Sequence, residues 1–161
     1  MKGNTEVLEC LNALLQGEYA ARDQYFLHAG YYDDLGLKKL HAHSKHESEH
    51  ENEHARAIRD RILMLGGTPA ETPHAVNTGS DVVSMLKNDL ALEYKVQADL
   101  KDAIQLCENK HDFVTRLMLV EQLKDTEEDH AYWLEQQLRL IELVGLPNYL
   151  QSQMGDDSES E

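Results

Sequence analysis

Residues that end helices are gathered at a few points of this chain and leave four long stretches uninterrupted. Only 3 prolines and 9 glycines occur among 161 residues. Turn signals lie at residues 33–36, 66–69, 107–109 and 145–147. No stretch shows the alternating pattern of a β-strand. We therefore predict an all-α protein with long helices over about residues 5–34, 38–65, 81–108 and 111–144.

The connections between these helices favour a four-helix bundle. Short links join the first helix to the second and the third to the fourth, so each pair forms an antiparallel hairpin. The loop at residues 67–79 reaches roughly 43 Å when extended, which is enough to cross helices about 42–51 Å long. We expect a ferritin-like bundle with one long crossover loop and a short fifth helix near residues 148–154. The domain then covers residues 1–154, followed by an acidic, disordered tail at 155–161.

The charge of the chain restricts its partners. Lysine and arginine number 15 against 30 acidic residues, which gives a net charge of −15. Such a surface repels nucleic acid and attracts cations. No apolar run is long enough for a membrane span, and the first ten residues lack the apolar core of a secretory signal. Cys10 and Cys107 form no CxxC motif and are expected to be buried, reduced thiols. We therefore expect a cytoplasmic protein without nucleic-acid or membrane partners.

Each predicted helix carries a glutamate in its apolar line. Residues seven apart lie close to one line along a helix. The glutamates and their apolar neighbours are Glu18 with Leu11 and Tyr25, Glu51 with Ile58 and Leu65, Glu93 with Leu86 and Leu100, and Glu127 with Val120 and Leu134. Each glutamate lies about 12–16 residues from the start of its helix, roughly 18–24 Å along the axis. The four carboxylates are therefore expected to meet near the middle of the bundle.

Two histidines turn this carboxylate cluster into a predicted metal centre. A buried, unpaired carboxylate costs several kcal/mol, so four together need cations. His54 follows Glu51 by three residues and His130 follows Glu127 by three, which places each pair on one helix face. A di-iron or di-manganese centre is predicted, with the ligands Glu18, Glu51, His54, Glu93, Glu127 and His130. The same ExxH spacing at Glu47–His50 is interpreted as a solvated face.

Motifs spread along the chain resemble those of the bacterioferritins. They are GE and QYFLH within residues 17–28, HES-x2-E-x2-HA at 46–55, DLALE at 89–93, EE-x-HAYWLE at 127–135 and NYLQSQ at 148–153. The resemblance implies a hollow 24-subunit shell that oxidises Fe(II) with O2 or peroxide and stores Fe(III) mineral. It also implies that the six residues named above are the ligands of the iron-oxidising centre.

Further roles follow from this resemblance. Tyr25 is either a core tyrosine hydrogen-bonded to a carboxylate or an electron donor beside the metals. In the family, the residues that match Tyr25 and Trp133 both lie near the metal centre. His46, His50 and His54 follow at four-residue steps, so one row of histidines could lead from the centre to the helix surface. The resemblance implies an inner-surface iron site at positions 46 and 50. Asn148 and Gln151 match a helix that lines a pore in the family, or simply face solvent.

One position departs from the haem-binding members of the family. Those proteins place a methionine in the second helix where this chain has Asn52, and an amide cannot replace a thioether as axial haem ligand. No haem is expected in the homo-oligomer. The resemblance is to the haem-free subunit type, which in some bacteria assembles with a haem-bearing companion. A ferredoxin-type reductant for iron release is a further partner to consider.

Other functions stay open at this point. A di-iron oxidase or peroxidase of the rubrerythrin type would need no storage shell. Such a protein is expected to carry a CxxC rubredoxin module, and this chain has no CxxC motif. A DNA-protecting mini-ferritin would have metal sites between subunits and often a basic tail, whereas this chain carries all six expected ligands and ends in acidic residues. The particle mass in solution separates these possibilities.

Overall fold

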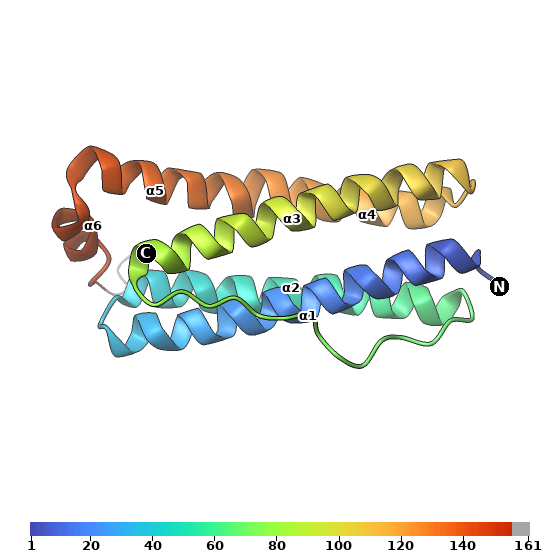
Figure 1. Cartoon of the computed structure of the whole chain (residues 1–161), viewed down its shortest axis with the longest axis horizontal. Helices are drawn as coiled ribbons and strands as arrows, with labels where there is room; N and C mark the ends of the chain where they lie inside the picture. The colour runs from blue at the N-terminus through green and yellow to red at the C-terminus, as the bar shows by residue number, and fades with distance from the viewer. Residues whose placement is uncertain (156–161) are drawn as a thin grey trace, which may run out of the picture.

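A computed structural model describes residues 1–155, so residues 156–161 of the predicted tail lie outside the described part. Four long helical rods form an antiparallel bundle, and a short helix lies across the end away from the N-terminus (Figure 1). The elements are α1 (Thr5–Asp34), α2 (Lys38–Met64), α3 (Val82–Asn109), α4 (Phe113–Asp125), the π-helical turn η1 (Thr126–Ala131), α5 (Tyr132–Val144) and α6 (Leu146–Ser152). The predicted all-α fold and its fifth helix are confirmed.

Local capping explains where the long helices begin. The Asn4 side chain accepts hydrogen bonds from the backbone of Glu6 and Val7, which otherwise lack partners in the first turn of α1. At the start of α3, Asp81 and Ser84 form a reciprocal capping box. Between α1 and α2, Gly36 has a φ of 77°, a conformation that costs glycine little. Short-range chemistry therefore sets these boundaries.

The crossover loop between α2 and α3 runs along α1 (Figure 1). Side chains of α1 hold it through its backbone carbonyls: Asn12 donates to Thr68, Gln16 to Thr72 and Tyr19 to Ala70, all at 3.0–3.2 Å. Further along, the backbone N–H of Gly79 donates to Nε2 of His28 at 3.1 Å. These contacts fix the path by which the two hairpins are joined.

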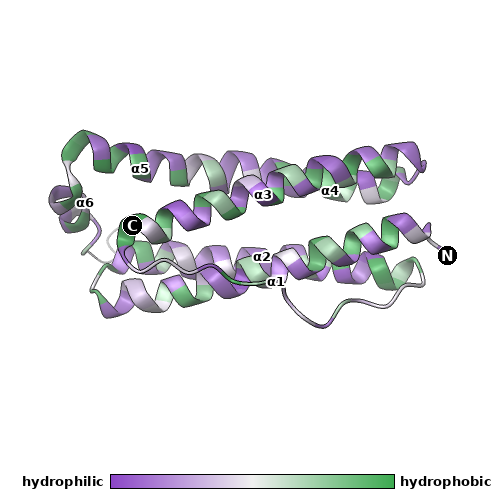
Figure 2. Ribbon diagram, in the orientation of Figure 1, coloured by the Kyte–Doolittle hydropathy of each residue, from purple (hydrophilic) through white to green (hydrophobic). Residues whose placement is uncertain are grey.

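The core consists of two apolar clusters with a polar layer between them. The first includes Val7, Leu11, Leu15, Ile58, Ile62, Leu100 and Leu119. The second includes Tyr32, Leu40, Leu86, Leu134 and Tyr149. Hydrophilic and hydrophobic residues alternate along every long helix (Figure 2), as amphipathic helices require. Each fully buried leucine or isoleucine stabilises by about 1.5–3 kcal/mol. The clusters therefore support a buried polar layer at mid-bundle.

The fourth rod differs from the predicted unbroken helix. A π-helical turn has hydrogen bonds from residue i to i+5, so it adds a residue to the turn and rotates the faces that follow. Val120, which lies within the regular helix α4, and Glu127 are exposed, whereas Leu119, Thr126 and His130 are buried. The predicted line through Val120, Glu127 and Leu134 was therefore wrong. Among the helices of residues 1–155, none combines the length and apolarity needed to cross a membrane.

Candidate metal centre

Three carboxylates from three helices meet in the polar layer. Glu18 of α1, Glu51 of α2 and Glu93 of α3 are each at most 2% exposed. Oε2 of Glu51 lies 3.1 Å from Nδ1 of His54, and Oε1 lies 3.0 Å from Nδ1 of His130. Glu51 therefore stands between the two histidines, with one oxygen directed to each.

The centre divides into two groups of donors that share Glu51. One consists of Glu18, Glu51 and His54, and the other of Glu51, Glu93 and His130. Nδ1 of His54 is 3.9 Å from Oε2 of Glu18, and Nδ1 of His130 is 3.4 Å from Oε1 of Glu93. Within each group the donor atoms lie within 4.8 Å of one another. Each group offers two carboxylates and one imidazole nitrogen, and Glu51 is the carboxylate that both groups share.

Burial and crowding perturb the acid–base properties of these groups. Burial, followed by repulsion from Glu51, raises the pKa of Glu18 well above its ordinary value and the pKa of Glu93 to about 7. Although burial opposes it, the close contacts with His130 and His54 hold the pKa of Glu51 well below its ordinary value. Against its own burial, His130 has a pKa raised far above its ordinary value by Glu47, Glu51 and Glu93. Protons thus neutralise part of the cluster, and divalent ions would displace them.

Buried atoms without hydrogen bonds test whether these residues fit metal ions. Oε2 of Glu18, Oε2 of Glu93 and Nδ1 of His130 are buried and have no hydrogen-bond partner. Such an orphaned group costs about 1–3 kcal/mol. All three belong to the two donor groups, where a cation would satisfy them. Hard carboxylate oxygens with one nitrogen per ion suit Fe(II) or Mn(II), so the residues fit the predicted centre.

Glu127 is the one expected ligand that lies apart from this cluster. Its side chain is 42% exposed and accepts a hydrogen bond of 2.7 Å from Nε2 of Gln97. Nζ of Lys101 lies 3.1 Å away, and its hydrogen bond lowers the pKa of Glu127. Glu127 lies on the same exposed helix line as Val120, and three buried carboxylates repel a fourth. The expectation that all four carboxylates meet is therefore not met for Glu127.

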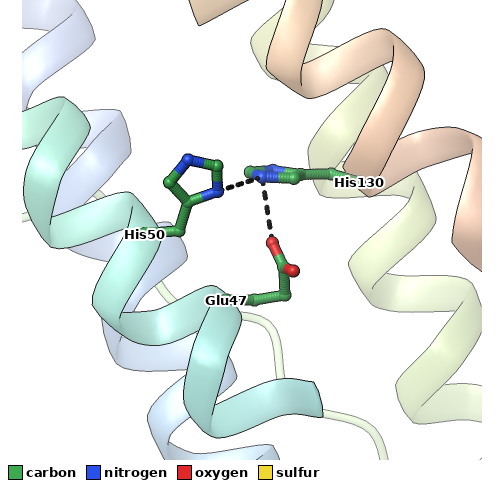
Figure 3. A group of neighbouring side chains, drawn as sticks. All are labelled: Glu47, His50 and His130. Carbon is green, nitrogen blue, oxygen red and sulfur yellow. Dashed lines mark hydrogen bonds and ion pairs between the residues drawn. The ribbon is translucent and has the colours of Figure 1, made fainter.

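Two carboxylates that sequence reasoning did not select contact the histidines from outside. Oε2 of Glu47 lies 2.9 Å from Nε2 of His130 (Figure 3). Oδ2 of Asp125 lies 3.2 Å from Nε2 of His54. The interpretation of Glu47 as part of a solvated face was wrong, because its side chain is only 5% exposed. Its position one turn before Glu51 was the available signal, but overlapping ExxH patterns in α2 concealed it.

The remaining candidates lie around the centre. Tyr25 is buried and donates a hydrogen bond to Oε1 of Glu93. The rings of His46, His50 and His54 form a row with centroid separations of 6.0 and 4.8 Å, and His46 is exposed. Trp133 stacks on His43 at 3.4 Å between ring centroids. The cysteines are free, with Cys107 buried and Cys10 only half-buried.

An all-α bundle with a buried carboxylate–histidine layer is typical of the ferritin-like proteins. Residues 8–144 match the family described as "Ferritin-like domain". The bacterial ferritin of Neisseria meningitidis serogroup B is 56% identical over 154 residues, which cover 96% of this chain and all of that protein. The bacterial ferritin of Pseudomonas aeruginosa is 54% identical over the same coverage. The bacterioferritin of Mycobacterium avium is 41% identical over 92% of this chain and 94% of that protein. The chain belongs to the bacterial ferritin, or bacterioferritin, family, as its motifs predicted.

Proposed function

We propose that this chain stores iron by oxidising Fe(II) to Fe(III) at the centre around Glu51 and depositing the product inside a 24-subunit shell. The observation that carries the proposal is the pair of buried donor groups that share Glu51. Its orphaned carboxylate oxygens favour divalent cations over a satisfied polar core. Relatives named bacterial ferritin over nearly the whole chain support iron as the cargo.

Five buried residues are proposed to bind the Fe(II) ions. Glu51 would be shared by two Fe(II) ions, with Glu18 and His54 holding one of them and Glu93 and His130 the other. Each Fe(II) gives up one electron, so four Fe(II) from two centres, with four protons, reduce one O2 to two waters. Hydrogen peroxide would need two Fe(II) and two protons for the same product. Burial of the donors keeps water from competing for the ions.

Glu127 and Tyr25 complete the proposed centre. Two divalent ions bring four positive charges, which would favour entry of Glu127 as a second bridge in place of its surface contacts with Lys101 and Gln97. Tyr25 orients Glu93 through its hydroxyl, and electron donation to the centre is its alternative role. His46 and His50 would bind iron ions that move between the centre and the surface of the bundle.

Aerobic addition of Fe(II) to the purified protein tests this function. We expect rapid formation of ferric product, a particle of about 440 kDa, the mass of 24 chains of 18.4 kDa, and retention of many iron atoms per particle. Size-exclusion chromatography with iron analysis of the same fraction gives all three quantities. A dimer that oxidises iron without retaining it would favour the rubrerythrin-type alternative.

The homo-oligomer is proposed to bind no haem, because of Asn52. Its Oδ1 accepts a hydrogen bond of 3.1 Å from Arg22, whose guanidinium lies 5.0 Å from the centre of the Tyr19 ring. An amide oxygen is a poor axial ligand for haem iron. Asn52→Met removes this contact and supplies a thioether, so we expect it to restore one haem per two subunits. Stoichiometric haem in the unchanged protein, measured by its Soret band, would refute this assignment.

Three further parts of the proposal do not depend on the metal centre. They are a cytoplasmic location, a haem-bearing companion subunit in a mixed shell, and a ferredoxin-type protein that returns electrons for iron release. Co-expression with a haem-bearing bacterioferritin, followed by mass spectrometry of the intact shell, tests the second of these.

A further inference from the structure

The two histidines of the centre each face a carboxylate on the side away from the metal donors. His130 directs Nδ1 towards Glu51 and Nε2 towards Glu47, which is 2.9 Å away (Figure 3). His54 directs Nδ1 towards Glu51 and Nε2 towards Asp125, which is 3.2 Å away. The same arrangement therefore occurs twice, with the inner nitrogens on Glu51 and the outer nitrogens on separate acids.

These outer contacts are exchanged between two helical rods. His54 lies on α2 and its acid, Asp125, is the last residue of α4. His130 lies in η1 and its acid, Glu47, comes from α2. Each rod thus supplies a histidine and also the carboxylate that holds the histidine of the other rod.

We propose that Glu47 and Asp125 are positioning residues, which fix the tautomer and the ring orientation of His130 and His54 so that each Nδ1 presents a lone pair to a metal ion. This inference rests on the proposed centre. A carboxylate accepts the Nε2–H, which leaves Nδ1 unprotonated once a metal ion replaces its proton. It also makes the ring a stronger ligand and restricts its rotation.

His50 competes with Glu47 for the outer nitrogen of His130. Its Nδ1 also lies 2.9 Å from Nε2 of His130. Nε2 carries a single hydrogen, and an ionised carboxylate is a stronger acceptor than a neutral imidazole. Oε2 of Glu47 is buried and makes no hydrogen bond, so its 2.9 Å contact with Nε2 of His130 is an ion pair, whereas His50 is 25% exposed. The negative charge and the burial of Glu47 therefore favour it as the acceptor.

The two positioning residues differ in burial, which ranks their effects. The Glu47 side chain is 5% exposed, and water has little access to replace it. The Asp125 side chain is 36% exposed, so water can take over part of its hydrogen bond to His54. Loss of Glu47 should therefore weaken its site more than loss of Asp125 weakens the other.

Anaerobic titration of the metal-stripped full-length protein with Co(II), followed by its d–d absorption, tests the inference without iron oxidation. We expect two ions per chain in the wild type. Glu47→Ala should lower the affinity for one of them about 10–100-fold and leave the other within about twofold. Glu47→Gln, a weaker acceptor of the same size, should give a smaller loss at the same site. Asp125→Asn should lower the affinity for the other ion, by a smaller factor than Glu47→Ala lowers the affinity for the first.

The control is Glu53→Gln, which removes an exposed carboxylate next to His54 and should leave both affinities unchanged. Unchanged affinities in Glu47→Ala would overturn the inference. So would equal loss of both ions with a lower melting temperature, because this indicates general damage to the fold. If His50→Ala lowers the affinity for one Co(II) ion and Glu47→Ala does not, the positioning role belongs to His50 instead. Glu18→Ala is titrated beside them: if it too retains both ions, the proposed centre itself fails.

Discussion

The two hairpins of the bundle deliver their metal-binding residues in different ways. In the α1–α2 hairpin the helices are regular, and Glu18, Glu51 and His54 lie in the buried layer where their spacing predicts. In the other hairpin, α3 is also regular and places Glu93 there, but η1 buries His130 and turns Glu127 outward. Heptad spacing does not by itself fix which line of a helix faces inward, since Val120 is exposed within the regular helix α4.

The π-helical turn separates two residues that a regular helix would keep together. Glu127 and His130 would share one face at the i, i+3 spacing of an α-helix. In η1, His130 is buried beside Glu51 while Glu127 pairs with Lys101 on α3. Such turns are frequent at functional sites. The second hairpin therefore keeps Glu127 outside the centre, whereas the first hairpin places both of its expected carboxylates, Glu18 and Glu51, inside it.

The largest expected effect comes from residues that both hairpins place inside the centre. Glu18→Ala, Glu93→Ala and His130→Ala should each slow rapid Fe(II) oxidation about 100-fold or more, because each removes a direct ligand. Assembly should be intact, since these side chains lie inside one subunit. Stopped-flow absorbance of the ferric product gives the rate, and size-exclusion chromatography checks the assembly. A variant with the wild-type rate would contradict the assignment of that residue.

The pH dependence of stability separates Glu93 from Glu127. With metal removed by a chelator, the folded pKa of Glu93 is about 7 against an ordinary value of 4.5, so the folded chain binds its proton more tightly than the unfolded chain does. Stability should therefore fall as the pH rises from 5 to 8, on the order of 2 kcal/mol or roughly 30-fold in the folding equilibrium. Denaturant unfolding at several pH values measures the slope. Glu18 and His130, whose pKa values are also raised, act in the same direction.

Two variants sharpen this test. Glu93→Gln should remove the contribution of Glu93 to the slope and leave the contributions of Glu18 and His130. Glu127→Gln should leave it in place, because Lys101 lowers the pKa of that exposed carboxylate and its titration lies at lower pH. Equal slopes in both variants would mean that the two glutamates occupy similar environments, contrary to the difference between the hairpins.

Replacement of Glu127 tests whether this exposed carboxylate joins the centre when metal ions bind. Glu127→Ala should slow Fe(II) oxidation about tenfold, less than the loss of a buried ligand, because Glu51 still bridges the ions. Glu128→Ala, an exposed neighbour in the same turn, is the matched control and should keep the wild-type rate. If both variants oxidise iron equally fast, Glu127 stays with Lys101 and takes no part in the reaction.

The smallest effect is expected where the hairpins touch each other. Tyr25→Phe removes the hydrogen bond that α1 makes to Glu93 of α3, and should slow oxidation roughly threefold, the equivalent of one hydrogen bond. Tyr94→Phe is a suitable control, because Tyr94 also bonds a glutamate, Glu135, but at the surface. A much larger loss in Tyr25→Phe alone would indicate electron donation rather than orientation of Glu93.

Much of the architecture could be read from local patterns. The predicted helices at 5–34 and 38–65 differ from the observed ones by at most one residue, because Asn4 and the glycines at 36 and 66 act on their own neighbours. The register of the fourth rod could not be read in this way. Its buried line includes His130, whose partners Glu51 and Glu93 lie on helices distant in sequence.

The sequence by itself determined the family through its motifs. It also determined the helices, the crossover and the position of the acidic residues along the bundle axis, since these follow from periodicity, turn chemistry and chain length. Only the tertiary structure decided which carboxylates face inward and which support them from outside. Glu127 was drawn to Lys101, while Glu47 was buried against His130. The physical reason is that spacing fixes a residue's position along its helix, whereas its rotation about the helix axis depends on the backbone hydrogen bonds and on partners from other helices.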